Sequence, residues 1–347
     1  MKNLIITFSM FSLFACKQEV NQKTATEKSS KKINIMQNPD INSKNFVSKI
    51  FEKVKHYPKE PIYYIRIGKA NCVIEVLVND YPVHNDYELS NYATPIEINH
   101  GILKSGIQKL TYRLYPIGDL MKENYSGDSP TVTTLTDLTS VNIKIIQMDN
   151  KGEKKFKDEV LVIEHNSQND KNGNFIASGK PYYEYTFEFI AEVPYELEGW
   201  TNGQDLTKLN QKLLEDKALE FHEIYQKVYE NQDGDALAKI EYNAIKRQSI
   251  MYYQNEIDIK EMWEDISKML YVKSITFNQI NNYKKVFFGN KKILMLMQNS
   301  LDIEYRGLGM FHMNYDKIDG SKTFMLAGLD LYLPKDKKLE DGLYIIE

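Results

Sequence analysis

Histidines and acidic residues are considered first, because these side chains most often bind metals or move protons. The six histidines are dispersed along the chain, at positions 56, 84, 100, 165, 222 and 312. His222-Glu223 begins the zinc-protease pattern His-Glu-x-x-His, but residue 226 is Gln, so the second histidine ligand is missing. We therefore expect an ordinary pair on a helix surface here, and no zinc site.

Two acidic segments could in principle bind a cation. Asp170-Lys171-Asn172-Gly173-Asn174 is similar to a calcium loop, but its glycine is out of register and no glutamate stands at the twelfth position. A polar hairpin turn is the simpler prediction. Asp233-Gly234-Asp235 precedes a helical pattern that starts at Leu237, so an N-cap is expected there. We expect no metal and no cofactor.

Short catalytic motifs are also missing from the sequence. It contains no Gly-x-Ser-x-Gly nucleophile elbow, no Walker phosphate loop and no Rossmann glycine fingerprint. No catalytic residue can therefore be named. An enzymatic function stays open only as an envelope hydrolase whose site these motifs do not mark.

Cys16 is the residue with the clearest chemical signal. Lys2 is followed by an apolar run from Leu4 to Phe14, which is shorter than the roughly 20 residues needed to span a bilayer. A positive start and an apolar run of this length are typical of a secretory signal peptide. The run ends in Leu13-Phe14-Ala15-Cys16, which resembles the lipobox of bacterial lipoproteins.

This resemblance implies that residues 1–15 are removed and that lipid is attached to Cys16, which gives stable membrane anchoring. Lys17 follows, rather than the Asp that retains such proteins at the inner membrane. We therefore expect a bacterial envelope protein, at the outer membrane more than the inner, on its periplasmic or surface face. An ordinary signal peptide and an uncleaved anchor are the alternatives.

The composition indicates a folded body after this leader, with 42% hydrophobic, 12% aromatic and 27% charged residues. The net charge of −4 provides no basic surface, so nucleic acid is not an expected partner. Cys72 is the second of two cysteines, and with Cys16 lipidated no disulfide framework is possible. No role for Cys72 follows from the sequence.

Residues 16–45 are predicted to form a flexible tether. They are rich in Lys, Gln, Asn, Thr, Ser and Glu, a composition that buries too little apolar surface to fold. Lysines outnumber acidic residues here, with Lys23, Lys28, Lys31, Lys32 and Lys44 against Glu27 and Asp40. This excess would favour anionic head groups, but a solvated linker is the preferred explanation.

Residues 46–198 are predicted to form an antiparallel β-sandwich preceded by a short helix. Phe46, Ile50 and Val54 recur at helical spacing, and from Pro61 the apolar residues alternate with period two. Alternation with one wet face is typical of antiparallel sheets. The clearest strands are residues 72–78, 110–115, 141–145 and 183–189.

Residues 199–347 are predicted to form an α+β domain, because helical patterns are followed by strands. Helices are expected over 206–231, 237–252 and 259–270, the first after a capping box of Thr201 and Gln204. Strands are expected over 284–288, 291–297, 301–305, 309–315 and 323–333. This order is similar to the cone-shaped fold of nuclear-transport-factor-like proteins, an analogy of fold that does not fix function.

One segment is a candidate binding loop. Tyr81, His84, Tyr87 and Tyr92 lie in what is predicted to be a long connection between strands, where sandwich domains place binding residues. Packing of these rings on the sheet edge is the simpler interpretation, because the chain contains 24 tyrosines. Trp200 is likewise expected to be structural.

Three further segments carry a resemblance: residues 72–79, Ile98-Asn99 with residues 102–106, and Leu331-Tyr332-Leu333-Pro334-Lys335. They are similar to uncharacterised bacterial envelope proteins that join a β-sandwich to a small α+β domain, including some regarded as immunity partners of secreted toxins. The resemblance implies a non-enzymatic, lipid-anchored protein that binds another protein. A glycan-binding or scaffolding lipoprotein is the alternative, beside the hydrolase.

Overall fold

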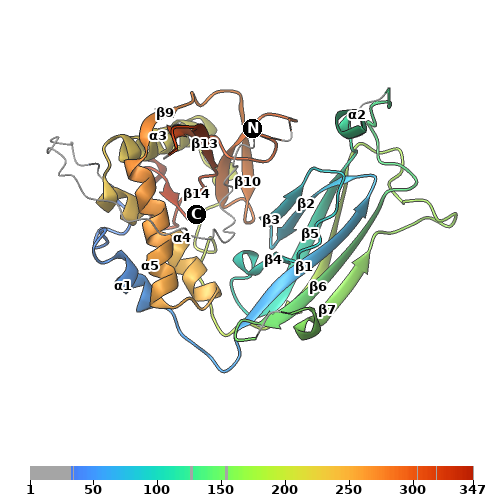
Figure 1. Cartoon of the computed structure of the whole chain (residues 1–347), viewed down its shortest axis with the longest axis horizontal. Coiled ribbons are helices and arrows are strands. Elements are labelled where there is room, and N and C mark those ends of the chain that lie inside the picture. Colours follow the sequence, from blue (N-terminus) through green and yellow to red (C-terminus); the bar gives the residue numbers. More distant parts are fainter. Residues whose placement is uncertain are drawn as a thin grey trace.

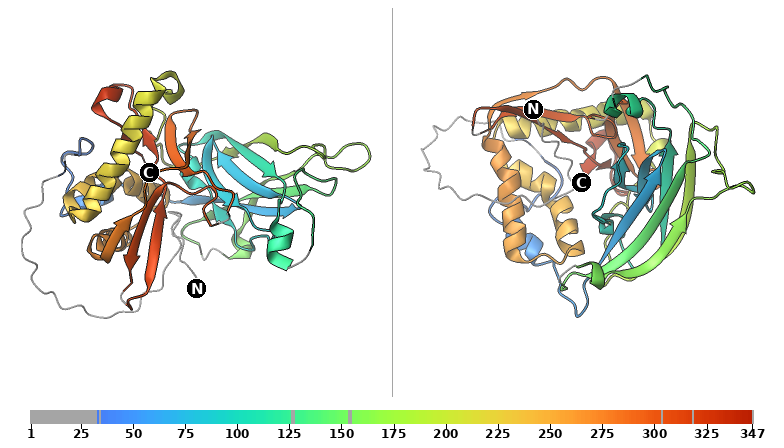
Figure 2. Two further views of the ribbon diagram at one scale, coloured as in Figure 1. Left: turned by 90° about the horizontal axis from the view of Figure 1, so that it is seen from above. Right: turned by 45° about the vertical axis from the view of Figure 1, so that its right-hand side comes forward.

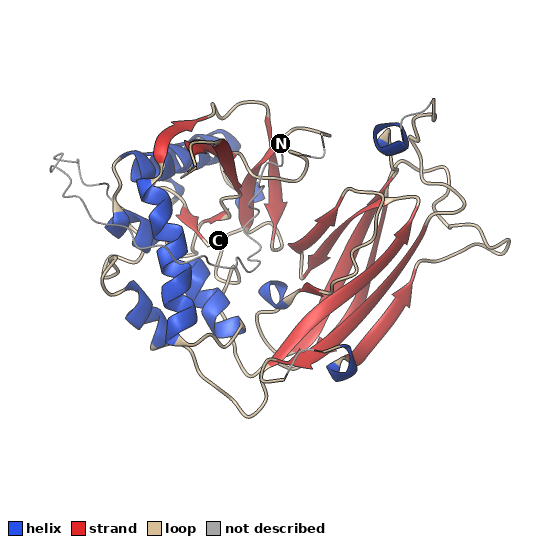
Figure 3. Cartoon of the chain, in the orientation of Figure 1, coloured by secondary structure: helices blue, strands red, loops and turns tan. Residues whose placement is uncertain are grey.

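A computed structural model describes residues 33, 35–125, 128–152, 155–302, 304–317 and 319–346. The lipobox, Cys16 and most of the predicted tether lie outside these residues. All the sheets in the described part are antiparallel, and helices accompany only some of them (Figure 3). The predicted class, mainly β plus α+β, is confirmed. No helix of the described residues is long and apolar enough to cross a membrane.

Two four-stranded sheets form the β-rich part on the right of Figure 1. The first has the order β4 (Ile96–Glu97), β1 (Pro61–Ala70), β6 (Ser140–Asp149), β7 (Val160–Asn166). The second has the order β3 (Tyr81–Asp86), β2 (Val73–Val78), β5 (Gly106–Tyr115), β8 (Tyr183–Ala191). The four strands named from alternation match β2, β5, β6 and β8, so period two was a sound indicator here.

The two sheets share one apolar core, and residues 61–198 are called the sandwich below. Ile65 of β1 and Ile143 of β6 pack in one buried cluster with Val76 of β2 and Leu110 of β5. These are the inward positions of the alternating strands, and their burial is the main apolar contribution to this half of the fold.

Three helices fold close to the predicted ranges: α3 (Gln211–Glu230), α4 (Gly234–Met251) and α5 (Glu256–Ser267). Asp233 caps α4 as expected, because its side chain accepts a hydrogen bond from the Ala236 amide at 3.0 Å. The capping box predicted at Thr201 is wrong. Asn210 caps α3 instead, and the Thr201 hydroxyl donates to the carbonyl oxygen of Glu198.

Two small sheets pack with these helices. One has the order β10 (Tyr283–Phe288), β11 (Ile293–Gln298), β14 (Leu331–Tyr332), β15 (Tyr344–Ile345), and the other β13 (Lys322–Ala327), β12 (Phe311–Asp316), β9 (Lys273–Phe277). Phe311 of β12 packs against Tyr225 of α3, with ring centroids 4.8 Å apart.

Two strand predictions in this region are wrong. Residues 301–305 were expected to be a strand, but the amides of Tyr305 and Arg306 bond to the carbonyl oxygen of Asp302 and make a turn. The range 323–333 is divided into β13 and β14. Gly328 lies at the division, where a Cβ would be 2.8 Å from the Met295 side chain.

The first described residues pack with the helices rather than with the sandwich. Phe46 of α1 (Phe46–Phe51) stacks on Trp263 of α5 at 4.3 Å, and Ile35 and Ile41 are buried in the same core. The predicted tether therefore extends too far, and α1 does not belong to the sandwich, because its apolar face finds α4 and α5. Residues 35–51 with 199–346 are called the α+β part below.

The sandwich and the α+β part lie side by side along the longest axis of the molecule (Figure 1), and Figure 2 shows the same arrangement from two other directions. α1 lies toward one end of this axis, and the short helix α2 (Leu120–Tyr125) lies in the half of the molecule toward the other end.

Candidate functional site

The four predicted binding-loop residues do not form one loop. Tyr81 and His84 lie on β3, where His84 is paired with Val76 of β2. The predicted long connection is therefore wrong over residues 81–86, because Tyr81 and Val83 alternate into buried positions as strand residues do. The connection begins at Tyr87, and Tyr92 is the exposed member of the four.

Tyr81 belongs to the contact between the two parts of the molecule. Its ring stacks on Trp200 with centroids 4.7 Å apart, and its hydroxyl donates to Oδ2 of Asp330 at 2.6 Å. The Arg247 guanidinium lies over both rings, 5.4 and 5.7 Å from their centroids. Burial raises the pKa of Asp330 to about 6, although Tyr81 and Arg247 act against this. The expected structural role of Trp200 is confirmed.

Tyr87 makes a second contact between the parts. Its hydroxyl donates to Oε1 of Glu75 at 2.7 Å, and the Arg306 guanidinium lies 4.1 Å from the centre of its ring. Tyr115 donates to the other oxygen of Glu75 at 3.1 Å, and its ring is also near Arg306. Tyr87 is thus buried by the turn around Asp302 and is not available to a partner.

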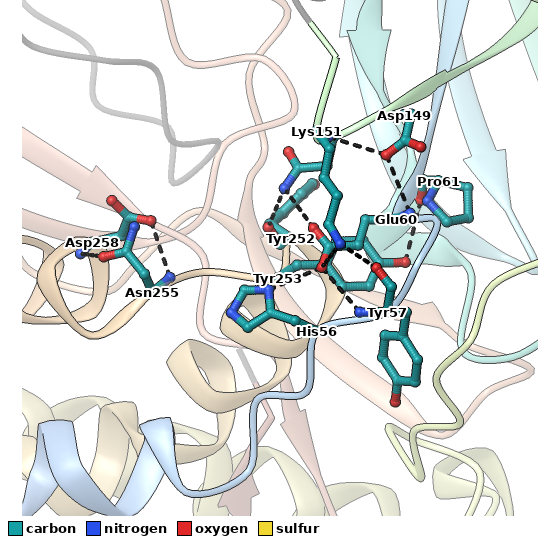
Figure 4. A network of polar contacts seen from close by, with 11 residues as sticks. His56, Tyr57, Glu60, Pro61, Asp149, Lys151, Tyr252, Tyr253, Asn255 and Asp258 are labelled. Carbon is teal, nitrogen blue, oxygen red and sulfur yellow. Dashed lines mark hydrogen bonds and ion pairs between the residues drawn. The ribbon is translucent and has the colours of Figure 1, made fainter.

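A third contact contains the arrangement closest to acid–base chemistry. Nδ1 of His56 is 2.9 Å from Oε1 of Glu60, whose carboxylate is buried (Figure 4). The amide of Tyr57 donates to the same oxygen at 3.2 Å, and Nζ of Lys151 lies 3.7 Å from it. Asn150 then donates from its side chain to the carbonyl of Tyr252 at 3.3 Å. These groups bind one another. They connect the segment between α1 and β1 to the β6–β7 turn and to the end of α4.

The connection after β3 is fixed by a buried ion pair. Nζ of Lys69 is 3.2 Å from Oδ2 of Asp86, and both side chains are almost fully buried. The Lys69 ammonium also donates to the carbonyl oxygens of Glu88 and Ser90. Asn91 accepts from the Lys69 amide at 2.8 Å and donates to its carbonyl at 3.1 Å. A charged residue therefore holds the loop backbone in one conformation.

This ion pair was missed from the sequence, although a signal existed. Ile65, Ile67 and Lys69 share the inward face of β1, and a charge on an apolar face needs a buried partner. Its partner, Asp86, lies seventeen residues away across two further strands, which no local pattern indicates.

Tyr92 is presented by this loop. It is 52% exposed, and its ring meets that of His84 edge to face at 5.4 Å. Burial, with a smaller effect of Lys69, lowers the pKa of His84 to about 4, so the imidazole is neutral at physiological pH. His84 therefore acts as an aromatic support for Tyr92 and not as a charged group.

Two neighbouring loops expose large aliphatic side chains, Leu138 at 77% and Ile176 at 49%. The Asn71 side chain, in the turn that follows Lys69, donates to the carbonyl of Leu138 at 3.2 Å. The Phe175 amide donates to the carbonyl of Asp137 at 3.0 Å. Residues 87–93, 133–139 and 168–180 are called the loop end below. Hydrogen bonds brace all three of its loops, and α2 lies at this end of the molecule (Figure 1).

The remaining polar motifs have structural partners. In the hairpin predicted at 170–174, Asp170 accepts from the amides of Asn172 and Asn174. His222 is fully buried rather than on a helix surface as predicted, and Nδ1 lies 2.8 Å from the carbonyl of Ala218. No group of three or more His, Cys, Asp or Glu within the described ranges could hold a metal ion.

Two further buried groups, Glu241 and Cys72, have raised pKa values. Glu241 of α4 accepts a hydrogen bond from the Tyr225 hydroxyl at 2.6 Å, and burial raises its pKa to about 7. Burial raises the pKa of the Cys72 thiol to about 12, so little reactive thiolate forms at neutral pH.

Comparison of the chain with family models, with curated proteins and with solved structures gives no match to any of them.

Proposed function

We propose that this protein is a lipid-anchored, non-enzymatic protein of the bacterial envelope, attached through Cys16, that binds another protein with the loop end. The observation that carries the proposal is the exposure of Tyr92, Leu138 and Ile176 on three neighbouring loops that are braced from within. Loops held in one conformation lose less entropy on binding, so exposed side chains on them can contribute more to affinity.

The distribution of exposed apolar side chains favours the sandwich over the α+β part, although only Tyr92, Leu138 and Ile176 of them belong to the loop end. Of the fifteen large hydrophobic residues exposed in the described ranges, ten lie in the sandwich and five in the α+β part. Singly exposed apolar residues are ordinary, but neighbouring ones indicate an interaction site. The sandwich is therefore the binding part of this proposal.

A protein partner is favoured over a glycan because two of the three exposed side chains are aliphatic. Sugar recognition relies on aromatic rings with polar neighbours, and Tyr92 is a single ring. A secreted toxin, for which this chain would be the immunity partner, is the form of protein partner that the sequence resemblance suggests.

The test is recovery of partners on the tagged, lipid-free chain that begins at Lys17. The fragment must include residues 35–45, because Ile35 and Ile41 are part of the core. Native envelope and culture supernatant are passed over the wild-type chain and two variants, Leu138→Glu and Leu301→Glu. Leu301 is 86% exposed in the α+β part and is the matched control.

We expect one stoichiometric protein with the wild type and with Leu301→Glu, and a loss of at least about tenfold with Leu138→Glu, as for a hot-spot residue. Recovery of no protein, or equal recovery by both variants, would contradict the proposal. Lipidation is checked separately, by the mass of the N-terminal peptide of the full chain purified from a bacterial membrane.

A further inference from the structure

The face of the α+β part that carries α1 and α5 has a distinct surface. Two adjoining grooves of about 640 and 540 Å³ lie on it, and Trp263 and Ser267 line both. Ile257 borders the first groove and is 67% exposed, and Tyr271 borders the second and is 64% exposed. These two side chains mark the ends of what is called the α5 face below.

The charges of the first groove are balanced, and the two carboxylates of the second groove accept hydrogen bonds from backbone amides. The first groove is lined by Lys44 and Lys260 together with Glu256 and Glu264. In the second groove the carboxylate of Asp235 accepts from the amide and the hydroxyl of Ser43. The two grooves are therefore lined by two lysines and four carboxylates, a small excess of negative charge, and the face presents one aliphatic and one amphipathic aromatic side chain.

The chain enters the described structure at this face. The amide of Ile33 lies 3.5 Å from Oδ2 of Asp233, which caps α4 and lines the second groove. Ser43 and Lys44 then form one wall of each groove. Ile33, the first described residue, therefore lies beside the second groove, which Tyr271 also lines.

The segment from Lys17 to Lys32 is sixteen residues long. Fully extended, sixteen residues span at most about 55 Å, and a flexible chain of that length has a root-mean-square span of about 24 Å. This root-mean-square span is small compared with the molecule, since helix α3 alone, with 20 residues, is about 30 Å long. A lipid on Cys16 would thus keep the α5 face close to the bilayer.

We propose that the α5 face rests on the lipid head groups of the membrane that anchors Cys16, with Ile257 and Tyr271 entering the interface. This rests on the lipid anchor of the proposed function and adds an orientation to it. Tyrosine is favoured at the membrane interface because its ring is apolar and its hydroxyl stays wet. Since the lining has no excess of positive charge, the contact does not depend on anionic lipid.

The orientation has a consequence for the loop end. α1 lies toward one end of the longest axis and α2 lies in the opposite half of the molecule (Figure 1), so the loop end points away from the bilayer when the α5 face rests on it. Tyr92 and Leu138 would then face the compartment in which a soluble partner diffuses.

Hydroxyl-radical footprinting of the lipidated full chain in vesicles tests this contact. The vesicles contain phosphatidylethanolamine and phosphatidylglycerol, and the reference is the lipid-free chain from Lys17 mixed with the same vesicles. Leu138, at 77% exposure, is the control for Ile257, and Tyr92, at 52%, is the control for Tyr271. We expect oxidation of Ile257 and Tyr271 to fall several-fold in the lipidated protein, while Leu138 and Tyr92 stay unchanged.

If lipidation is verified and the oxidation of Ile257 changes no more than that of Leu138 relative to the lipid-free chain, the proposed contact is wrong and the anchor is unaffected. If the N-terminal peptide carries no lipid, the anchor fails instead. The chain from Cys16 is then coupled through that thiol to a maleimide lipid and footprinted in the same way. Cys72 does not compete in this coupling, because its thiol is buried.

Discussion

Buried ionisable groups have different roles in the sandwich and in the α+β part. In the sandwich, the pair Lys69–Asp86 organises a loop whose outer residues are exposed. In the α+β part, Glu241 is buried between α3 and α4, where it bonds to Tyr225 and supports no exposed residue. The Lys69–Asp86 pair thus fixes the conformation of an exposed loop, whereas Glu241 lies within the core. Substitutions at both places can test this difference.

Lys69→Met should give the largest effect. It leaves the Asp86 carboxylate buried without its cation, which costs about 3 to 5 kcal/mol. It also frees the carbonyl oxygens of Glu88 and Ser90, so the loop end should lose both its order and its partner. Urea unfolding measures the first effect, and hydrogen exchange of residues 86–93 measures the second.

The double variant Lys69→Met/Asp86→Leu separates the two effects. It removes both charges, so a large share of the stability should return while the loop stays mobile. Recovery of partner binding by the double variant would show that the loop does not need the ammonium group.

The next effect is at the contact between the two parts. Tyr81→Phe removes the hydroxyl that donates to Asp330 and leaves the buried carboxylate with one fewer donor, at a cost of about 1 to 3 kcal/mol. Ser105→Ala is a comparison inside the sandwich, since its hydroxyl bonds only to backbone groups of Val193. If the parts are joined as described, Tyr81→Phe but not Ser105→Ala should make unfolding of the sandwich and the α+β part non-coincident.

The sequence was informative wherever local rules decide the structure. Alternation located β2, β5, β6 and β8, and the cap at Asp233 located the start of α4. It failed where distant residues decide. Phe46 could not reveal that it stacks on Trp263, and Tyr81 could not reveal that Trp200 and Asp330 would bury it. Of the predicted binding loop, only Tyr92 is exposed. His84 is paired with β2, Arg306 covers Tyr87, and Tyr81 is buried as just described.

Glu241 gives a pH-dependent prediction for the core charge. Its pKa is about 7 in the folded protein and near 4.5 when unfolded, so the folded state holds its proton more tightly. The contribution of Glu241 to stability should therefore fall as the pH rises from about 4.5 to 7 and then level off. Burial lowers the pKa of His84, His100 and His222 to about 4, so these histidines act in the opposite direction, and only a comparison with a Glu241 variant isolates this contribution. Asp330, with a pKa raised to about 6, contributes in the same direction as Glu241 over a lower range.

Glu241→Gln should remove its share of this loss, because a neutral amide can still accept from Tyr225. The variant should match the wild type near pH 4 and exceed it by about 1 to 3 kcal/mol above pH 7. Urea unfolding at a series of pH values measures the difference. A constant difference from pH 5 to 8 would show that the carboxyl group does not titrate in this range. Partner binding should be unaffected, which distinguishes this charge from Lys69.

The smallest effect on stability is expected at the loop end itself. Leu138→Glu and Leu301→Glu both change highly exposed side chains, so each should alter the unfolding free energy by no more than about 0.5 kcal/mol. Leu138→Glu offers the sharper comparison with Lys69→Met, because it should abolish partner binding without making the loop more mobile. A stability loss above about 1 kcal/mol in Leu138→Glu alone would assign Leu138 to the fold rather than to binding, since such a loss is beyond what exposed positions show. Equal stabilities of Leu138→Glu and Leu301→Glu with unequal partner recovery would instead separate two roles. The hydrogen-bonded loops would fix the conformation of the surface, and the side chains that they expose would contact the partner.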